Sequence, residues 1–209
     1  GQLMLKDDAV ILFQGDSVTD AGRSREDDSE LGLGYPRIVS SWLAAKYPEK
    51  RMRFLNRGIS GNRVKDLRAR WQEDCLELKP DILTILIGIN DCWRRYDSSD
   101  PTSPEKYEGD YRWILTQAKE KTEAQIILLE PFVLPYPEDR IAWREDLDPK
   151  IQVVRKLARQ FNARLVPTDG LFAKAAAQRE PQFWAPDGVH PSPAGHALIA
   201  QALIRELEG

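Results

Sequence analysis

The chain has 209 residues, of which 42% are hydrophobic, and this length and composition suit a single globular domain over residues 1–209 with a substantial core. Its 30 basic and 33 acidic residues give a formal net charge of −3 without a long basic run, which argues against a nucleic-acid partner. The apolar run at residues 9–13 is too short to cross a bilayer, so we expect no membrane partner either.

The only two cysteines, Cys75 and Cys92, are too few for the disulfide framework of a small secreted protein and lack metal-type spacing. They predict a reducing compartment and therefore a cytoplasmic protein, although a signal peptide removed earlier would leave the same sequence. The histidines, cysteines and carboxylates form no cluster with transition-metal spacing, and no Gly-rich phosphate loop is found. We therefore expect neither a metal nor a cofactor.

Short apolar runs recur along the chain and predict about five strands. These runs lie at residues 10–13, 52–55, 82–87, 126–129 and 164–166. Helical patterns separate them. In the first, Ile38, Val39, Trp42 and Leu43 recur at spacings of three to four, as expected for one buried helix face. Further helices are expected at residues 64–78, 104–121, 141–161 and 193–207.

Strands that are apolar nearly throughout and alternate with helices predict a parallel sheet that is covered on both faces. The expected fold is therefore α/β, a three-layer α/β/α sandwich. The Pro and Asp content of residues 94–104 and 131–149 predicts irregular loops over much of both stretches. Long loops in a compact domain are often lids or subunit contacts.

In such sheets ligands bind beyond the carboxyl ends of the strands. The turn Gly15, Asp16, Ser17 follows the first predicted strand, and near the other end of the chain Asp187 precedes His190 by three residues. A serine hydroxyl becomes a good nucleophile when a neutral imidazole accepts its proton and a carboxylate orients that imidazole. We predict that Ser17, His190 and Asp187 form such a triad.

Each of these residues has an ordinary structural interpretation when taken alone. A serine after a strand usually caps a helix or lies in a turn, and an aspartate followed by glycine is a common turn signal. The chain has only two histidines, however, and one of them stands in register with Asp187. The second, His196, follows a helix start marked by Ser192 and Pro193, so we expect it to be structural.

Acyl transfer also needs donors for the oxyanion that develops in the transition state. The turn glycine Gly61 offers a backbone amide after the second strand, and Asn90 offers a side-chain amide after the third. Asp16 and Asp20 flank Ser17, and we expect both to accept backbone hydrogen bonds at a helix start.

With these motifs in hand, the sequence resembles the SGNH hydrolases, also called the GDSL esterase and lipase family. The resemblance rests on four blocks in the family's order: Gly15, Asp16, Ser17; Gly61; Gly88, Ile89, Asn90, Asp91; and Asp187, Gly188, Val189, His190. It implies a flavodoxin-like sheet, Ser17 as nucleophile, His190 as base and then acid, and Asp187 as its orienting partner. It also implies an oxyanion hole made by the amides of Ser17 and Gly61 with the side chain of Asn90.

Residues 58–64 and 89–97 are similar to those of bacterial members that deacetylate xylan and related sugars. This similarity implies an esterase for short acyl groups, acetyl above all, on a small-molecule or oligosaccharide alcohol, and makes a homo-oligomer plausible. Trp93 and Trp184 lie next to catalytic blocks and are candidates for sugar contact, with core packing as the alternative. A lipase, lysophospholipase or thioesterase for longer acyl chains remains open, as does a carbohydrate-binding protein with an idle triad.

Overall fold

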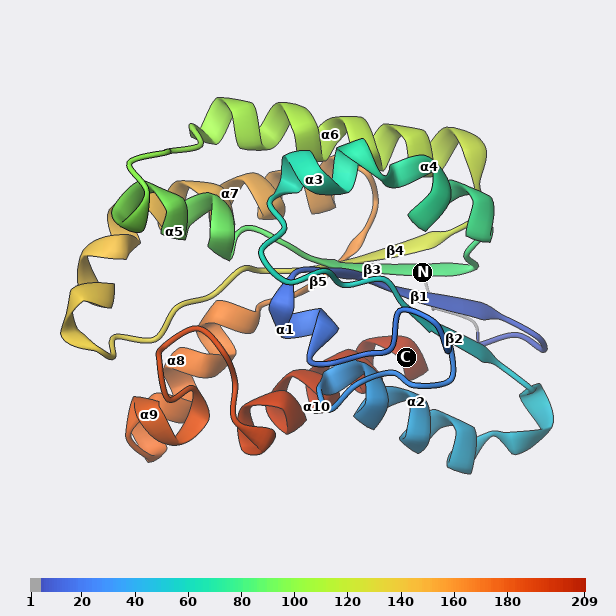
Figure 1. Cartoon of the computed structure of the whole chain (residues 1–209). Helices are drawn as coiled ribbons and strands as arrows, with labels where there is room; N and C mark the ends of the chain where they lie inside the picture. Colours follow the sequence, from blue (N-terminus) through green and yellow to red (C-terminus); the bar gives the residue numbers. More distant parts are fainter. Residues whose placement is uncertain (1–4) are drawn as a thin grey trace.

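The computed structural model describes residues 5–209, and residues 1–4 of the predicted domain lie outside the described residues. Its centre is a five-stranded sheet in the order β2-β1-β3-β4-β5, in which all neighbouring strands are parallel. The strands are β1 (Val10–Gly15), β2 (Arg53–Asn56), β3 (Ile82–Leu86), β4 (Gln125–Leu129) and β5 (Arg164–Val166) (Figure 1). The predicted α/β/α sandwich is confirmed, with the flavodoxin-like strand order.

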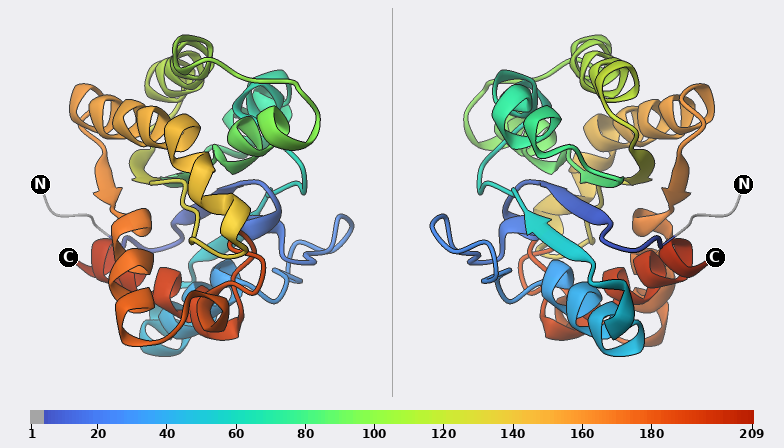
Figure 2. Two further views of the ribbon diagram at one scale, coloured as in Figure 1. Left: turned by 90° about the vertical axis from the view of Figure 1, so that its left-hand side faces the viewer. Right: turned by 90° about the vertical axis from the view of Figure 1, so that its right-hand side faces the viewer.

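Helices cover both faces of the sheet, as Figure 1 and the side views of Figure 2 show. On one face lie α3 (Val64–Ala69), α4 (Trp71–Asp74), α5 (Ile89–Asp97), α6 (Pro104–Lys121) and α7 (Arg144–Gln160). On the other lie α1 (Ser17–Asp20), α2 (Tyr35–Lys46), α8 (Thr168–Gln178), α9 (Pro181–Trp184) and α10 (Pro193–Glu208). Three short 3-10 helices, η1 (Pro48–Lys50), η2 (Leu76–Leu78) and η3 (Glu138–Trp143), lie in connections.

The strands hold the two helical layers together because successive side chains point to opposite faces. In β1, Leu12 packs into the core beneath α3, α6 and α7, whereas Ile11 and Phe13 pack into the core shared with α2 and α10. Strands buried on both faces need apolar residues at nearly every position, which explains the continuous apolar runs in the sequence.

Trp42 departs from the expected burial of α2, since 56% of it is exposed. The helix buries Tyr35, Val39 and Leu43, which recur every four residues and face α10. Its buried stripe is therefore narrower than the sequence pattern predicts, and Trp42 lies beside the stripe rather than within it.

The helix expected over residues 64–78 is divided into α3, α4 and η2. At the first break, Arg70 donates hydrogen bonds to the carbonyl oxygen of Gly15 at 3.3 Å and to Asn62 Oδ1 at 2.8 Å. The break thus coincides with a residue that ties this segment to the carboxyl end of β1.

The loop predictions were partly wrong. Residues 94–97 end α5, and residues 138–149 form η3 and the start of α7, so the irregular segments shrink to 98–103 and 130–137. Pro149 lies inside α7 without ending it. Neighbouring Leu147 and Ile151 bury their side chains in the core, and this packing outweighs the low helix propensity of proline. No helix in the described part of the chain is long and apolar enough to cross a membrane.

Candidate active site

The structure brings together the three predicted triad side chains at the carboxyl end of the sheet. Ser17 is the first residue of α1, directly beyond β1, while Asp187 and His190 lie between α9 and α10. Ser17 Oγ lies 3.0 Å from His190 Nε2, and His190 Nδ1 lies 2.6 Å from Asp187 Oδ2. Two hydrogen bonds in series therefore connect a serine, an imidazole and a carboxylate.

Backbone amides fix the Asp187 carboxylate in place. Its Oδ1 accepts from the amides of Val189 at 2.9 Å and His190 at 2.7 Å, which closes a tight turn around Gly188 at φ +83°. Partial burial opposes ionisation of Asp187, but the hydrogen bonds from the His190 ring and from these amides outweigh it and hold the pKa of the carboxyl well below its usual value.

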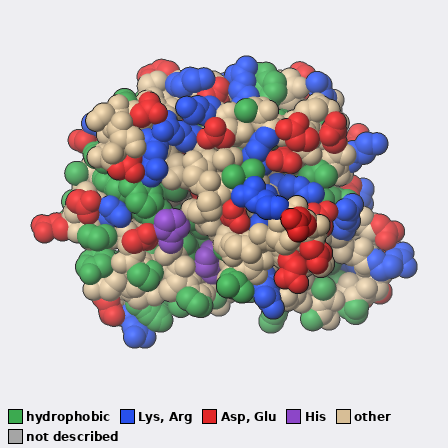
Figure 3. Space-filling view, viewed as in Figure 1, with side chains coloured by type: hydrophobic (Ala, Val, Ile, Leu, Met, Phe, Trp, Pro, Cys, Tyr) green, Lys and Arg blue, Asp and Glu red, His purple; other side chains and the backbone are tan. Residues whose placement is uncertain are grey.

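The pKa of His190 shifts in the opposite direction to that of Asp187. The hydrogen bond to Asp187 raises the pKa of His190 above its ordinary 6.5, while partial burial and the charge of Arg140 act against the rise. His190 remains exposed, and histidine side chains reach the surface on the face shown in Figure 3. The base is therefore within reach of a ligand from solvent.

The second histidine lies elsewhere, as its sequence context predicts. His196 is in α10, is 8% exposed, and accepts a hydrogen bond from the backbone amide of Tyr35 at its Nδ1, 3.0 Å away. Burial lowers the pKa of His196 to about 4, so the ring stays neutral at physiological pH. Its contacts join α10 to the start of α2.

The predicted oxyanion donors come from the ends of three adjacent strands. Asn90, in the first turn of α5 beyond β3, donates its Nδ2 to the carbonyl oxygen of Asn62, 3.1 Å away. That bond ties Asn90 to the residue after Gly61, which has φ +85° and open space where a side chain would begin. Among residues 5–209, the amides of Ser17 and Gly61 have no hydrogen-bond acceptor.

Two buried carboxylates hold the segment that carries Gly61. Asp20 Oδ2 accepts from the amide and the hydroxyl of Ser60, at 3.1 and 3.2 Å, and Asp91 Oδ2 accepts from the amide of Val64 at 3.2 Å. Asp20 therefore serves a neighbouring loop instead of the helix start expected for it. Burial raises the pKa of Asp91 to about 7.

Asp16 is the N-cap of α1, as expected, because its Oδ1 accepts from the amide of Val18 at 3.0 Å. Full burial raises the pKa of this carboxyl to about 7. The cap fixes the first turn of α1 and therefore the backbone from which Ser17 projects.

The two candidate tryptophans have different surroundings. The ring of Trp93 lies 5.9 Å from that of His190, centroid to centroid, so this tryptophan borders the triad. Trp184 packs against Phe183 at 4.9 Å and donates its indole N–H to the carbonyl oxygen of Arg179, contacts that belong to the α9 region. The geometry favours Trp93 over Trp184 as a wall of the site.

Sequence reasoning missed Arg140 because it lies in a stretch expected to be an irregular loop. Its Nε donates to the carbonyl oxygen of Asp187 at 3.0 Å, and its guanidinium lies over the rings of Trp93 and Trp143. No motif marks this arginine, and only the folded chain brings it to the turn that carries Asp187.

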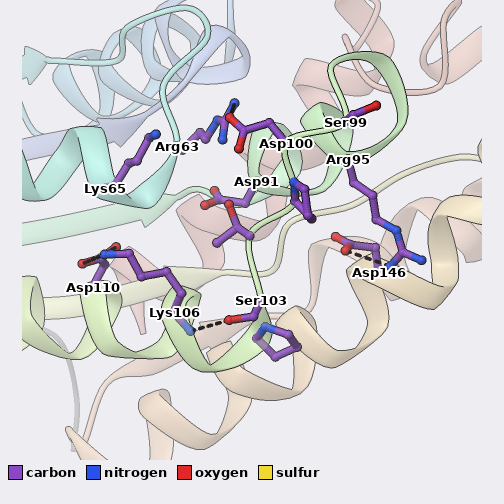
Figure 4. A pocket seen from close by; sticks show the side chains of 13 residues that line it. Arg63, Lys65, Asp91, Arg95, Ser99, Asp100, Ser103, Lys106, Asp110 and Asp146 are labelled. Atoms are coloured by element: carbon purple, nitrogen blue, oxygen red, sulfur yellow. Dashed lines mark hydrogen bonds and ion pairs between the residues drawn. The ribbon is translucent and has the colours of Figure 1, made fainter.

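A cavity of about 740 Å³ lies between α3, the segment from α5 to α6, and α7 (Figure 4). Four basic and four acidic side chains line this cavity, so their charges balance. Asp91, the neighbour of Asn90, is one of the acidic residues. None of the triad residues lines this cavity. Within residues 5–209, no group of three or more histidines, cysteines and carboxylates is arranged to hold a metal ion.

The sequence profile of the GDSL-like lipase and acylhydrolase family matches residues 13–198. The chain belongs to this family. It is 41% identical over 207 residues to an acetylxylan esterase from Geobacillus stearothermophilus, with 94% of this chain and 93% of that protein covered. The protein is accordingly a carboxylic ester hydrolase.

Solved structures agree with this membership of the GDSL family. A Parabacteroides merdae protein described as a GDSL-like lipase superposes with a TM-score of 0.95 at 38% identity, covering 99% of each chain. Axe2, an acetylxylan esterase from Geobacillus stearothermophilus, superposes with a TM-score of 0.89 at 37% identity, covering 98% of this chain and 96% of that one.

Proposed function

We propose that this protein hydrolyses acetyl and other short acyl esters of carbohydrates or similar polar alcohols, with Ser17, His190 and Asp187 as its catalytic triad. The observation that carries the proposal is the unbroken series of hydrogen bonds from Ser17 Oγ through the His190 ring to Asp187. Each bond has the length expected of a nucleophile, base and orienting acid.

In the first half of the reaction, Ser17 Oγ attacks the ester carbonyl carbon as His190 Nε2 takes the hydroxyl proton. The carbonyl π electrons move to its oxygen, which receives hydrogen bonds from the amides of Ser17 and Gly61 and from Asn90 Nδ2. When the tetrahedral intermediate collapses, the bond to the alcohol breaks and His190 returns the proton to the departing alcohol. Ser17 is left acylated.

In the second half, water attacks the acyl carbon and His190 Nε2 accepts a proton from it. Collapse of the second tetrahedral intermediate breaks the bond to Ser17 Oγ, which regains its proton from His190 as the carboxylic acid leaves. Asp187 keeps its negative charge throughout and stabilises the imidazolium that forms in each half. No redox or metal step is needed to balance the reaction.

Two observations support a short acyl group. The relative with 41% identity over 94% of this chain is an acetylxylan esterase. In addition, the bulky Trp93 borders the triad, with its ring 5.9 Å from that of His190, and a wall of this kind suits a short acyl group better than a long alkyl chain.

The proposal is tested by Ser17→Ala, with Ser98→Ala as the control. Ser98 is an exposed serine at the end of α5 that bonds to Asp97 and touches no triad group. Ser17→Ala should lower turnover of a soluble acetyl ester by on the order of a million-fold, and should abolish labelling by a serine-directed organophosphate. Ser98→Ala should keep both. A Ser17→Ala protein with a tenth of normal turnover would reject the triad.

A further inference from the structure

Arg140 makes a direct bond to the turn that carries Asp187 and His190. Its Nε lies 3.0 Å from the carbonyl oxygen of Asp187, and its side chain is 12% exposed. The bond goes to the backbone rather than to the carboxylate, so it leaves the Asp187 side chain free to hold His190. The Arg140 side chain thus helps to hold the backbone from which the orienting carboxylate projects.

The guanidinium is itself held on several sides. It lies 4.3 Å from the ring centroid of Trp143 and 5.2 Å from that of Trp93, and Nη1 pairs with Asp139 at 3.0 Å. Trp143 is buried and stacks on Tyr96 at 5.6 Å. Stacking and hydrogen bonds of this kind suit the planar arginine side chain and not the flexible lysine.

The segment that leads to Arg140 fits the same turn closely. The amide of Leu134 donates to the carbonyl oxygen of Gly188 at 2.9 Å. A side chain at Gly188 would place its Cβ 2.1 Å from the carbonyl oxygen of Tyr136, so only glycine permits this approach. Residues 134–140 therefore pack against the turn that carries Asp187 and His190. Arg140 connects this segment to Trp93, which lies beside His190, and to Trp143.

We propose that Arg140 is a positioning residue that locks the Asp187–His190 turn over Ser17. This inference rests on the proposed function, because positioning affects turnover only where the triad is catalytic. Shifts of about 1 Å in reacting groups can cost roughly a hundred-fold in rate. Loss of the Arg140 bond should accordingly lower kcat and leave KM nearly unchanged, since Arg140 acts through Asp187 and not on the substrate.

The test compares Arg140→Lys and Arg140→Met with Arg94→Met in the full-length enzyme. Arg94 also lies over Trp93, at 5.1 Å, but it pairs with Asp97 and has no bond to the turn. With an acetyl ester, both Arg140 variants should lose about ten- to a hundred-fold in kcat with KM within about twofold. Arg94→Met should stay within about twofold of the native enzyme in both constants.

Proton NMR supplies a readout that does not depend on turnover. The proton between His190 Nδ1 and Asp187 Oδ2 should give a downfield signal in the native protein, identified by its loss in His190→Ala. Arg140→Lys and Arg140→Met should broaden or remove that signal, and Arg94→Met should keep it. Arg140→Lys retains the positive charge, so native kcat together with a native signal in this variant would overturn the proposal.

Other outcomes are equally decisive. A raised KM with native kcat would make Arg140 a substrate-binding residue and reject positioning. If the Ser17→Ala variant kept the activity of the native enzyme, the proposed function would be wrong. The NMR comparison would still decide whether Arg140 orders the turn that carries Asp187 and His190. Should Arg140→Met prove unfolded by circular dichroism, Arg140→Lys carries the test alone.

Discussion

Asn90 has a side chain whose position is set before substrate arrives. One hydrogen bond from its amide, to the carbonyl oxygen of Asn62 at 3.1 Å, fixes its orientation, and 5% of the residue is exposed. A donor held in this way pays little reorganisation when an oxyanion forms nearby. The same bond connects two of the three segments that carry the proposed oxyanion donors, the first turn of α5 and the segment with Gly61.

We expect Asn90→Ala to lower kcat by about a hundred- to a thousand-fold, because one oxyanion donor is removed. KM should change little, since the ground-state carbonyl gains less from this donor. Steady-state kinetics on a soluble acetyl ester measure both constants. Near-normal kcat with a raised KM would instead make Asn90 a binding residue.

The pH dependence of activity follows from His190. Only the neutral ring can accept the Ser17 proton, and Asp187 raises the pKa of His190 above 6.5. The value of kcat/KM should therefore rise with pH and reach half its maximum at a pH above 6.5. Rates of acetyl ester hydrolysis from about pH 5 to 9 test this in the free enzyme. A midpoint well below the ordinary histidine value would contradict the Asp187–His190 bond.

At the scale of elements, His196 couples α10 to α2 and makes that contact sensitive to acid. A protonated Nδ1 could not accept the Tyr35 amide, and burial already lowers the pKa of His196 to about 4. Because the folded-state pKa lies below the unfolded value, the unfolded chain binds a proton first as pH falls. The stability that neutral His196 contributes is complete above pH 6.5 and is lost between there and about pH 4.

His196→Gln should remove this acid sensitivity, since its amide oxygen can accept the Tyr35 amide without titrating. Urea unfolding at about pH 7 and 5 should show the native protein losing about 2 kcal/mol more than the variant over that interval. His190 contributes with the opposite sign, but it is present in both proteins and cancels in the comparison. Equal losses in the two proteins would exclude His196 as the acid-sensitive group.

For the whole molecule, the sheet order decides which loops meet. Because β1 lies between β2 and β3, the segments that carry Ser17, Gly61 and Asn90 emerge side by side. The turn between α9 and α10 then brings His190 to Ser17 across 173 residues of sequence. Self-association and a cytoplasmic location remain predictions from the sequence.

The acyl chain length that this protein prefers can be predicted from the assembled site. We expect an acetyl ester to react much faster than the octanoyl ester of the same alcohol, because the bulky Trp93 borders the triad, with its ring 5.9 Å from that of His190. In a pocket that accepted longer chains, each methylene would contribute about 0.8 kcal/mol. Initial rates on soluble esters with one leaving group provide the measurement. Rates that climb steadily from acetyl to octanoyl would favour a lipase or thioesterase.

The local sequence was sufficient to predict the sheet and the helices α2, α6, α7 and α10, but it missed α5 and α8. It also named Ser17, His190 and Asp187, which the structure brings within hydrogen-bonding distance. Continuous apolar runs reflect strands buried on both faces, and Asp187 and His190 lie within one turn. Ser17 could be paired with them because the chain offers only two histidines, one of which lies beyond a marked helix start. These features depend on short-range pattern or on composition.

Tertiary structure decided the features that depend on distant neighbours. Trp42 is exposed because α10 covers only one row of α2, and Asp20 serves the Gly61 loop because β2 lies next to β1. Arg140 reaches the carbonyl oxygen of Asp187 across 47 residues of sequence. A side chain's partners are set by which segments pack together, and that packing is a property of the whole fold and not of any local pattern.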